Sequence, residues 1–291
     1  MTEKKPNPLL WEIRLFFTSL MFYTRIPCPR WVGYSDEQLN QSTRYFPSIG
    51  WIVGGLVAII IGLAQLIVPV SVAVVTGLAV GVLITGAFHE DGFGDVCDGF
   101  GGGSTAERTL EIMKDSRVGA YATIGLILLF AVKISSLIAL VTLEPWYGLV
   151  AVVYAHVLSR TSVVTIIFTD VYARNDLTSK VKPIGRQISL GGLIVSCCWL
   201  LPFILLLWAR PWWFLALPVA LLCRWRLGHW FKKRLGGYTG DCLGAAQQII
   251  EVVTFLVILG IIGLLRWWEP VSIVPLAGSW LTITSGWLAL L

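Results

Sequence analysis

The sequence predicts an all-α fold: a polytopic integral membrane bundle of about eight transmembrane helices, forming a single domain over residues 1–291. Three observations predict it. Hydrophobic residues make up 56% of the chain and charged residues 13%, with a mean hydropathy of +0.77, whereas a soluble chain carries about 25% charged residues. Apolar blocks exceed the roughly 18 residues that mark a membrane-spanning helix. Lysine and arginine are concentrated in alternate connections. A water-soluble globule is excluded.

The N-terminal segment differs from the apolar blocks that follow it. Prolines and charged side chains interrupt it, so it lacks the continuous apolar region of a cleavable signal peptide. We expect an N-terminal amphipathic helix that lies on the membrane surface, with Phe17 and Met21 against lipid and Arg14 and Arg25 among the headgroups.

The membrane spans follow in order. Residues 45–88 contain no Asp, Glu, Lys or Arg, which at about 20 residues per crossing is enough for two helices. Pro69 splits this stretch into a hairpin. The sixth expected span is short and contains Pro218, and the eighth contains Pro275. The eight expected spans are residues 48–68, 71–88, 119–143, 146–168, 188–208, 211–225, 245–265 and 271–291.

The positions of lysine and arginine test this layout independently. Of the 22 such residues, 18 lie on one predicted side of the membrane, and only Arg210 and Arg266 lie on the other. Basic residues concentrate in cytoplasmic loops, so we expect eight crossings with both termini cytoplasmic. The net charge of +5 therefore reflects topology and not nucleic-acid binding. Six cysteines without a CxxC pair argue against a disulfide framework or a structural zinc site.

Acidic residues are concentrated after the second expected span. Seven of the 17 lie within residues 90–115. Asp91, Asp95 and Asp98 are spaced i, i+4, i+7, so they share one helix face if that span continues past Phe88. Their carboxylates would repel one another, and Mg²⁺ would remove the conflict because it takes oxygen ligands from carboxylates, water and substrate phosphates.

Glycines are interleaved with these acids at positions 92, 94 and 99. A solvated acidic cap on a helix is the simpler interpretation of the carboxylates. Glycine is a poor helix former without side-chain bulk, however, and it suits a place where a ligand approaches the backbone closely. The combination favours a metal or phosphate site over a cap.

The following segment contains a glycine run and basic residues. Ser104 and Glu107 form a capping-box pattern after residues 101–103, which predicts that a new helix begins there. Lys114 and Arg117 are spaced i, i+3 and suit phosphate oxygens, Arg in bidentate fashion. The alternative is that both are juxtamembrane anchors, and the glycine run is equally compatible with a plain turn.

A second site-like segment lies near the C-terminus. Four glycines surround Asp241 in residues 236–244, ahead of an apolar helix that contains Glu251. An intramembrane carboxylate is a functional candidate by default. Both acidic segments, residues 89–118 and 232–244, face the cytoplasm in the predicted topology and are expected to form the main parts of the active site. Arg160 is a further candidate in a span, with snorkelling as its alternative, and Lys133 and His156 are also borne by spans.

The order of these motifs resembles the adenosylcobinamide-GDP ribazoletransferase (cobalamin synthase) family. The resemblance covers nearly the whole chain, because its motifs are separated and in sequence: Phe22–Pro27, Phe46–Gly50, Phe88–Gly99, Leu110–Gly119 and Gly236–Ala246. The chain departs from the family pattern in having Glu90 where an apolar residue is usual and Gly94 where alanine is usual.

The resemblance implies a Mg²⁺-dependent enzyme of the bacterial inner membrane. Its members join adenosylcobinamide-GDP with α-ribazole or α-ribazole 5′-phosphate and release GMP. On this basis Asp91, Asp95, Asp98 and Asp241 are expected to hold Mg²⁺, and Asp98, Lys114, Arg117 and Asp241 to be catalytic, with Asp241 completing the metal site or accepting the hydroxyl proton. The expected substrate-binding residues are Arg108, Glu111, Lys114, Asp115, Arg117, Arg160, Thr239 and Gly240.

Two other classes of membrane protein share part of this pattern. A CDP-alcohol phosphotransferase also places aspartates at a cytoplasmic helix end, but the gap from Asp91 to Asp95 is too short for that family's spacing. An ion-coupled transporter would hold its acidic sites near the bilayer midplane, whereas these acids cluster at a membrane edge. Both classes are kept as alternatives to the ribazoletransferase. Whether the chain forms a homo-oligomer is a separate question that the sequence leaves open.

Overall fold

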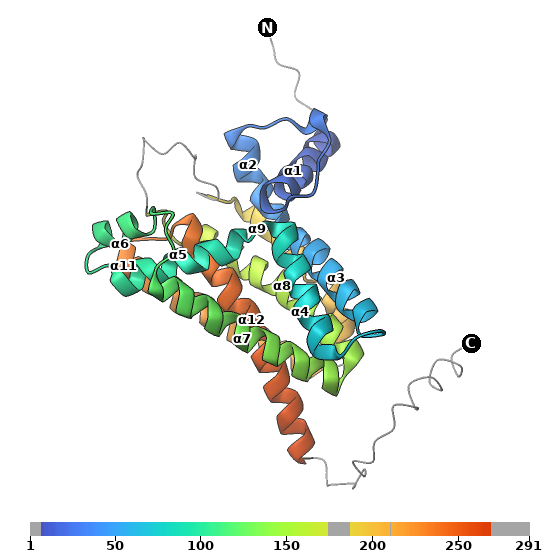
Figure 1. The fold of residues 1–291 in the computed structure, drawn as a ribbon. Coiled ribbons are helices and arrows are strands. Elements are labelled where there is room, and N and C mark those ends of the chain that lie inside the picture. Colours follow the sequence, from blue (N-terminus) through green and yellow to red (C-terminus); the bar gives the residue numbers. More distant parts are fainter. Residues whose placement is uncertain (1–6, 174–186, 210, 269–291) are drawn as a thin grey trace.

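The computed structural model describes residues 7–173, 187–209 and 211–268, and its named elements within these ranges are all helical (Figure 1). One isolated parallel bridge joins Tyr172 and Tyr238. The α-helices are α1 (Pro8–Tyr23), α2 (Asp36–Ser42), α3 (Phe46–Ala64), α4 (Val70–Thr85), α5 (Phe88–Gly102), α6 (Ala106–Ile112), α7 (Ala120–Leu143), α8 (Pro145–Thr169), α9 (Leu190–Cys198), α10 (Pro202–Ala209), α11 (Ala216–Leu235) and α12 (Gly240–Trp268).

The multi-pass helical fold is confirmed, but the described residues do not confirm eight spans. Four helical segments are long and apolar enough to cross a membrane: 36–64, 120–143, 145–169 and 240–265. The bent pair of α4 and α5 makes a fifth if it counts as one span. The expected span 188–208 is divided between α9 and α10, with Pro202 at the start of α10. The expected span 271–291 lies outside the described residues.

The expected span 211–225 is also different in the structure. A 3₁₀-helix (Pro211–Leu215) occupies its first residues, and α11 then continues ten residues beyond its predicted end. From its ninth residue onward, α11 carries Arg224, Arg226, Lys232, Lys233 and Arg234. With these charges, α11 is not among the helices that are apolar enough to span a membrane.

The junction of α4 and α5 is a sharp break. The two helices meet at an angle of 89°, and Gly86 and Ala87 between them are both left-handed, with φ of 67° and 60°. Glycine tolerates this conformation, and the Arg25 guanidinium packs where a side chain on Gly86 would lie, with Nε 2.4 Å from the position of an added Cβ. The second span therefore does not continue straight into the acidic segment as expected, although that segment is helical.

Helix α8 is the centre of the bundle. It packs against α3, α7 and α12, and 83% of its most apolar window is buried. Gly50 and Gly54 of α3 allow close approach, because a Cβ added at Gly50 would lie 2.6 Å from the carbonyl oxygen of His156. Pro69 precedes α4, so the predicted hairpin of α3 and α4 is confirmed.

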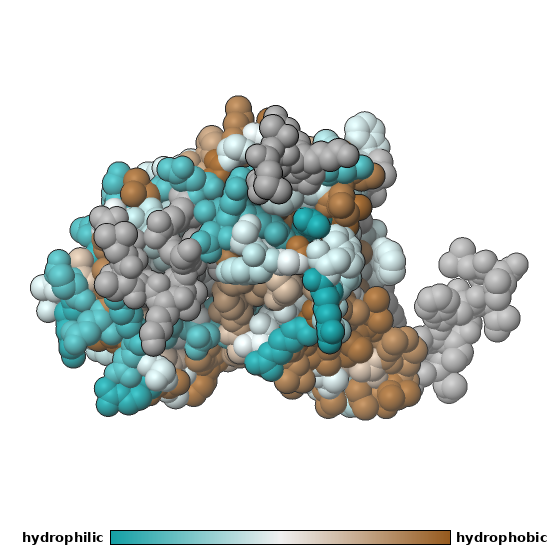
Figure 2. Space-filling model, turned by 90° about the horizontal axis from the view of Figure 1, so that it is seen from above, coloured by the Kyte–Doolittle hydropathy of each residue, from teal (hydrophilic) through white to brown (hydrophobic). Residues whose placement is uncertain are grey.

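Hydrophilic and hydrophobic residues separate along the molecule. Seen from above, the teal residues gather mainly over the end where Figure 1 places α6 and α11, and brown residues predominate toward the opposite end (Figure 2). The acidic helix α5 runs toward the hydrophilic end, so its last residues lie where polar side chains collect.

Candidate active site

The two acidic segments meet where α5 packs against the first turns of α12. A Cβ added at Gly92 would lie 3.0 Å from Cα and 3.0 Å from the carbonyl oxygen of Asp241. A Cβ added at Gly244 would lie 3.1 Å from the carbonyl oxygen of His89. The helices thus touch backbone to backbone, which confirms that the segments converge.

This contact changes the interpretation of the glycines in α5. Gly92 faces α12, and a Cβ at Gly99 would lie 2.4 Å from Cγ of Met113. At both positions another part of the same chain packs where a Cβ would lie. These glycines are therefore explained by helix packing and not by the approach of a ligand. Gly94 is different, since an added Cβ would meet Ala122 only at an ordinary 3.5 Å.

The aspartates of α5 have different surroundings. Asp91 is exposed, and Asp95, four residues later, is half-buried. Asp98 accepts hydrogen bonds from the backbone N–H of Gly119 at 2.6 Å and of Ala122 at 2.9 Å. Gly119 is the N-cap of α7 and offers no side-chain cap of its own, so Asp98 caps that helix from a distant position in the sequence. This role was not predicted.

The predicted metal ligands do not form a ready cluster. Across the described ranges, no three His, Cys, Asp or Glu side chains are grouped so that they could hold a metal ion. The structure therefore brings the acidic segments together without converging Asp91, Asp95, Asp98 and Asp241 on one point.

Five of the predicted site residues line one open cleft of about 540 Å³. The cleft lies between the end of α5, helix α6 and the start of α7, and Gly102 and Tyr121 also line it. Tyr121 is 56% exposed. The five predicted residues are Asp98, Arg108, Glu111, Asp115 and Arg117.

Two ion pairs hold the arginines of this cleft. Arg108 donates to Glu111 at 2.6 Å, and Arg117 donates to Asp115 at 2.5 Å. The Arg117 guanidinium, through its hydrogen bonds to the carboxylate, lowers the pKa of Asp115 to about 2, and Asp115 in turn raises the pKa of Arg117. Both arginines present guanidinium groups, which suit phosphate oxygens, to an open cleft.

Helix α6 begins one residue later than the capping-box pattern predicted. Its N-cap is Thr105, whose hydroxyl accepts a hydrogen bond from the N–H of Arg108 at 3.2 Å, and not Ser104. Lys114 is exposed just after this helix and is not among the residues that line the cleft.

The remaining predicted residues of the C-terminal segment lie at the start of α12. Thr239 is buried, and its hydroxyl accepts from the N–H of Cys242 at 3.3 Å and contacts Asp241 Oδ2 at 3.4 Å. Gly240 is exposed and Asp241 is half-buried. The backbone of Asp241 packs against Gly92 of α5, whereas a Cβ added at Gly240 would meet nothing within 4 Å. None of the three residues lines the cleft.

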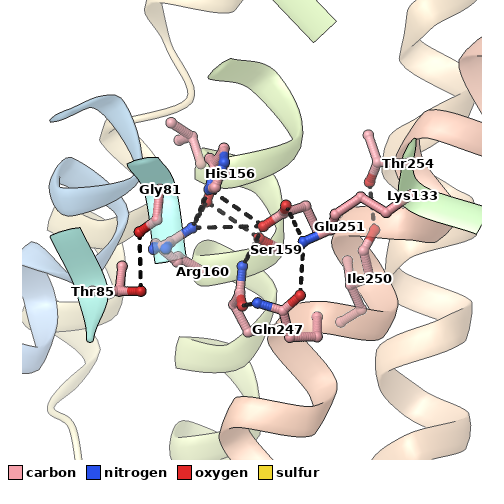
Figure 3. Close-up of polar contacts among 12 residues, drawn as sticks. Gly81, Thr85, Lys133, His156, Ser159, Arg160, Gln247, Ile250, Glu251 and Thr254 are labelled. Atoms are coloured by element: carbon pink, nitrogen blue, oxygen red, sulfur yellow. Dashed lines mark hydrogen bonds and ion pairs between the residues drawn. The ribbon is translucent and has the colours of Figure 1, made fainter. Parts of the chain in front are cut away.

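Arg160 lies elsewhere, in a buried polar cluster inside the bundle (Figure 3). It is only 1% exposed, and its guanidinium contacts His156 Nδ1 at 2.9 Å. Glu251, which is fully buried, forms an ion pair with Lys133 at 2.8 Å and lies 3.3 Å from His156 Nδ1. The three span-borne candidates and Glu251 therefore belong to one cluster contributed by α7, α8 and α12.

Two glutamines extend this cluster, and sequence reasoning missed both. Gln247 donates to Glu251 at 2.6 Å (Figure 3). Gln248 accepts from Lys133 at 2.7 Å and donates to Glu90 at 2.8 Å. Glu90, the residue that departs from the family pattern, thus belongs to the buried cluster and not to the exposed acids. The sequence does contain a signal for them, because two adjacent glutamines in an otherwise apolar helix indicate buried polar contacts.

Comparison with known proteins decides the family. A sequence model described as cobalamin-5-phosphate synthase matches residues 15–259. The chain belongs to this family. The adenosylcobinamide-GDP ribazoletransferase of Shewanella frigidimarina is 44% identical to it over 251 residues, which is 86% of this chain and 95% of that relative.

Further relatives with the same name agree. The proteins of Leptothrix cholodnii and Shewanella oneidensis are 41% and 42% identical over 85% and 87% of this chain, and over 96% and 97% of their own length. No solved structure matches the chain. The match to the cobalamin-5-phosphate synthase family spans the cleft, the contact of α5 with α12 and the buried cluster, so all three lie in the part that the family shares.

Proposed function

We propose that this protein is an adenosylcobinamide-GDP ribazoletransferase that joins adenosylcobinamide-GDP with α-ribazole or its 5′-phosphate in the final steps of cobalamin biosynthesis. One observation carries the proposal: relatives with this name are 41–44% identical over at least 85% of the chain. The cleft that collects Arg108 and Arg117 supports it, because the donor substrate carries a diphosphate.

The chemistry is a displacement at phosphorus. A ribazole hydroxyl oxygen forms a bond to the phosphoryl group that is attached to the cobinamide. The bond to the GMP oxygen breaks, GMP leaves with the electron pair, and the hydroxyl proton passes to a base. Such reactions need charge neutralisation and in-line positioning above all. Arg108 and Arg117 would bind the diphosphate, and Lys114 would add charge nearby. Asp241 would either accept the proton or complete the metal site.

Magnesium is part of this proposal. Protein sites commonly bind Mg²⁺ through one or two carboxylates, with water and substrate phosphates completing the shell, so a preformed three-carboxylate site is not required. One or two of Asp91, Asp95, Asp98 and Asp241 would supply the carboxylate oxygens. When bound, the ion would neutralise charge on the diphosphate.

The membrane placement is proposed as the bacterial inner membrane with both termini in the cytoplasm. The distribution of Lys and Arg supports this orientation. Helix α1 is proposed to lie at the interface, since Leu10 and Met21 are 41% and 39% exposed. Labelling of single cysteines introduced at Lys114 and Arg210 tests the topology: only the latter should react from the periplasmic side.

The test of function uses detergent-purified protein with adenosylcobinamide-GDP and α-ribazole. Mass spectrometry of the corrinoid product should show the added ribazole moiety, and chelation of Mg²⁺ should abolish its formation. Folded protein that yields no such product would contradict the proposal. Product that forms at the full rate with all divalent ions chelated would contradict only the role of magnesium.

A further inference from the structure

The C-terminal end of α5 is held by a residue from another helix. The last carbonyl groups of a helix have no partner within it, and residues 101–103 are glycines without polar side chains. Arg234, at the end of α11, donates from one guanidinium nitrogen to the carbonyl oxygens of Phe100 at 2.9 Å and Gly103 at 2.8 Å. A cation at this end is also favoured by the helix dipole.

Aromatic contacts strengthen the same connection. The guanidinium carbon of Arg234 lies 5.3 Å from the centroid of the Phe100 ring, within the range of a cation–π interaction. Trp230 packs edge-on against Phe100 at 4.6 Å between centroids, and Phe231 at 6.1 Å. Helix α11 therefore holds the end of α5 by hydrogen bonds and by ring packing.

The opposite side of this end forms a wall of the cleft. Asp98 and Gly102 both line it, and Asp98 also caps α7. The Tyr121 ring covers Gly101, because a Cβ added there would lie 2.5 Å from Cγ of Tyr121. Arg234 is not among the lining residues. A shift of the α5 end would displace Asp98 and Tyr121 together, although Arg234 itself would not contact the substrate.

We propose that Arg234 is a positioning residue for the transfer reaction, which fixes the wall of the cleft that receives the diphosphate of the GDP-bearing substrate. This inference rests on the proposed function. The cleft contains the arginines suited to phosphate, so loss of Arg234 affects the nucleotide-bearing substrate and not the ribazole acceptor.

The test compares Arg234→Ala and Arg234→Lys with Arg226→Ala, which removes an exposed guanidinium from the same helix. Because a displaced cleft wall would contact the bound diphosphate less well in both the ground state and the transition state, we expect Arg234→Ala to raise KM for adenosylcobinamide-GDP roughly tenfold or more. KM for α-ribazole should stay within about twofold. Lysine should restore only part of the effect, since an ammonium does not stack on Phe100 as a planar guanidinium does.

A chemical-rescue experiment separates positioning from a general loss of structure. Millimolar guanidinium, added to Arg234→Ala, should lower KM for adenosylcobinamide-GDP toward the wild-type value and leave Arg226→Ala unchanged. If Arg234→Ala fails to fold, Arg234→Lys carries the KM comparison. Wild-type kinetics in both Arg234→Ala and Arg234→Lys would overturn the inference. Equal rises in KM for adenosylcobinamide-GDP and KM for α-ribazole, without rescue by guanidinium, would overturn it as well. Wild-type protein without product would instead overturn the proposed function.

Discussion

Arg108 and Arg117, which form the ion pairs of the cleft, are proposed to bind the diphosphate of the donor substrate. Arg117→Gln keeps a polar side chain but removes the charge, so we expect KM for adenosylcobinamide-GDP to rise by about tenfold or more, given that hydrogen bonds to charged groups contribute about 1.5–3 kcal/mol. Initial-rate kinetics of the purified variant measures this. An unchanged KM would show that the diphosphate binds elsewhere.

The pH dependence of the same pair has a definite sign. The pKa of Asp115 is depressed to about 2 by Arg117, whereas a free aspartate has a pKa of about 3.9. The pair is therefore fully formed above about pH 4, and it is lost as pH falls through about 2. KM for adenosylcobinamide-GDP should show no Asp115 titration between about pH 5 and 8. An inflection in that range that disappears in Asp115→Asn would contradict the assignment.

Asp98 combines a structural contact with a predicted catalytic charge. Asp98→Ala removes the acceptor for the N–H groups of Gly119 and Ala122, and loss of such a cap costs about 0.5–2 kcal/mol. Thermal unfolding in detergent should show a lower midpoint. Asp98→Asn keeps only one of the two acceptor oxygens, so it should retain part of the stability while losing activity if the charge is needed. Full activity in Asp98→Asn would show that Asp98 caps α7 and has no catalytic role.

Single residues also show where sequence reasoning ended. Asp98, Arg108 and Arg117 were expected in one site, and the cleft brings them together. The cap that Asp98 provides for α7 could not be predicted, because its donors lie 21 and 24 residues away. Arg234 was missed because its partners are backbone carbonyls, which leave no mark in the sequence.

At the scale of elements, the contact of α5 with α12 decides how the two acidic segments meet. Gly92→Ala would place a Cβ 3.0 Å from backbone atoms of Asp241, so the helices must separate. We expect a lower unfolding midpoint and a large loss of activity. Gly94→Ala is the matched control, since its Cβ would make an ordinary contact at 3.5 Å and alanine favours a helix by up to about 1 kcal/mol. Equal behaviour of the two variants would contradict this packing.

The elements differ in how far the sequence predicted them. Three elements lie close to their expected bounds: the hairpin at Pro69, helix α7 and helix α8. Their bounds are set by local sequence features, namely long apolar runs and a proline. The break at Gly86 and Ala87 was not predicted. It depends on a left-handed alanine and on the packing of Arg25, which lies just after α1 and is distant in the sequence, and neither follows from a local pattern.

At the scale of the whole molecule, the buried cluster joins α5, α7, α8 and α12. Lys133→Met would leave Glu251 buried without its closest cation, and breaking a buried pair costs about 3–5 kcal/mol. The double variant Lys133→Met with Glu251→Leu should recover much of this loss. Thermal unfolding of both variants measures it. If the double variant were less stable than Lys133→Met, the Lys133–Glu251 ion pair would not be the main interaction of Glu251 in this cluster.

The proposed function is a transfer between two substrates at the end of the bundle where α5, α6 and α11 lie (Figure 1). The most direct measurement follows GMP release from adenosylcobinamide-GDP by the purified protein with and without α-ribazole. We expect release only when α-ribazole is present, with one corrinoid product formed for each GMP. Release at the same rate without α-ribazole would show a hydrolase, and no release by folded protein in either condition would contradict the assigned activity altogether.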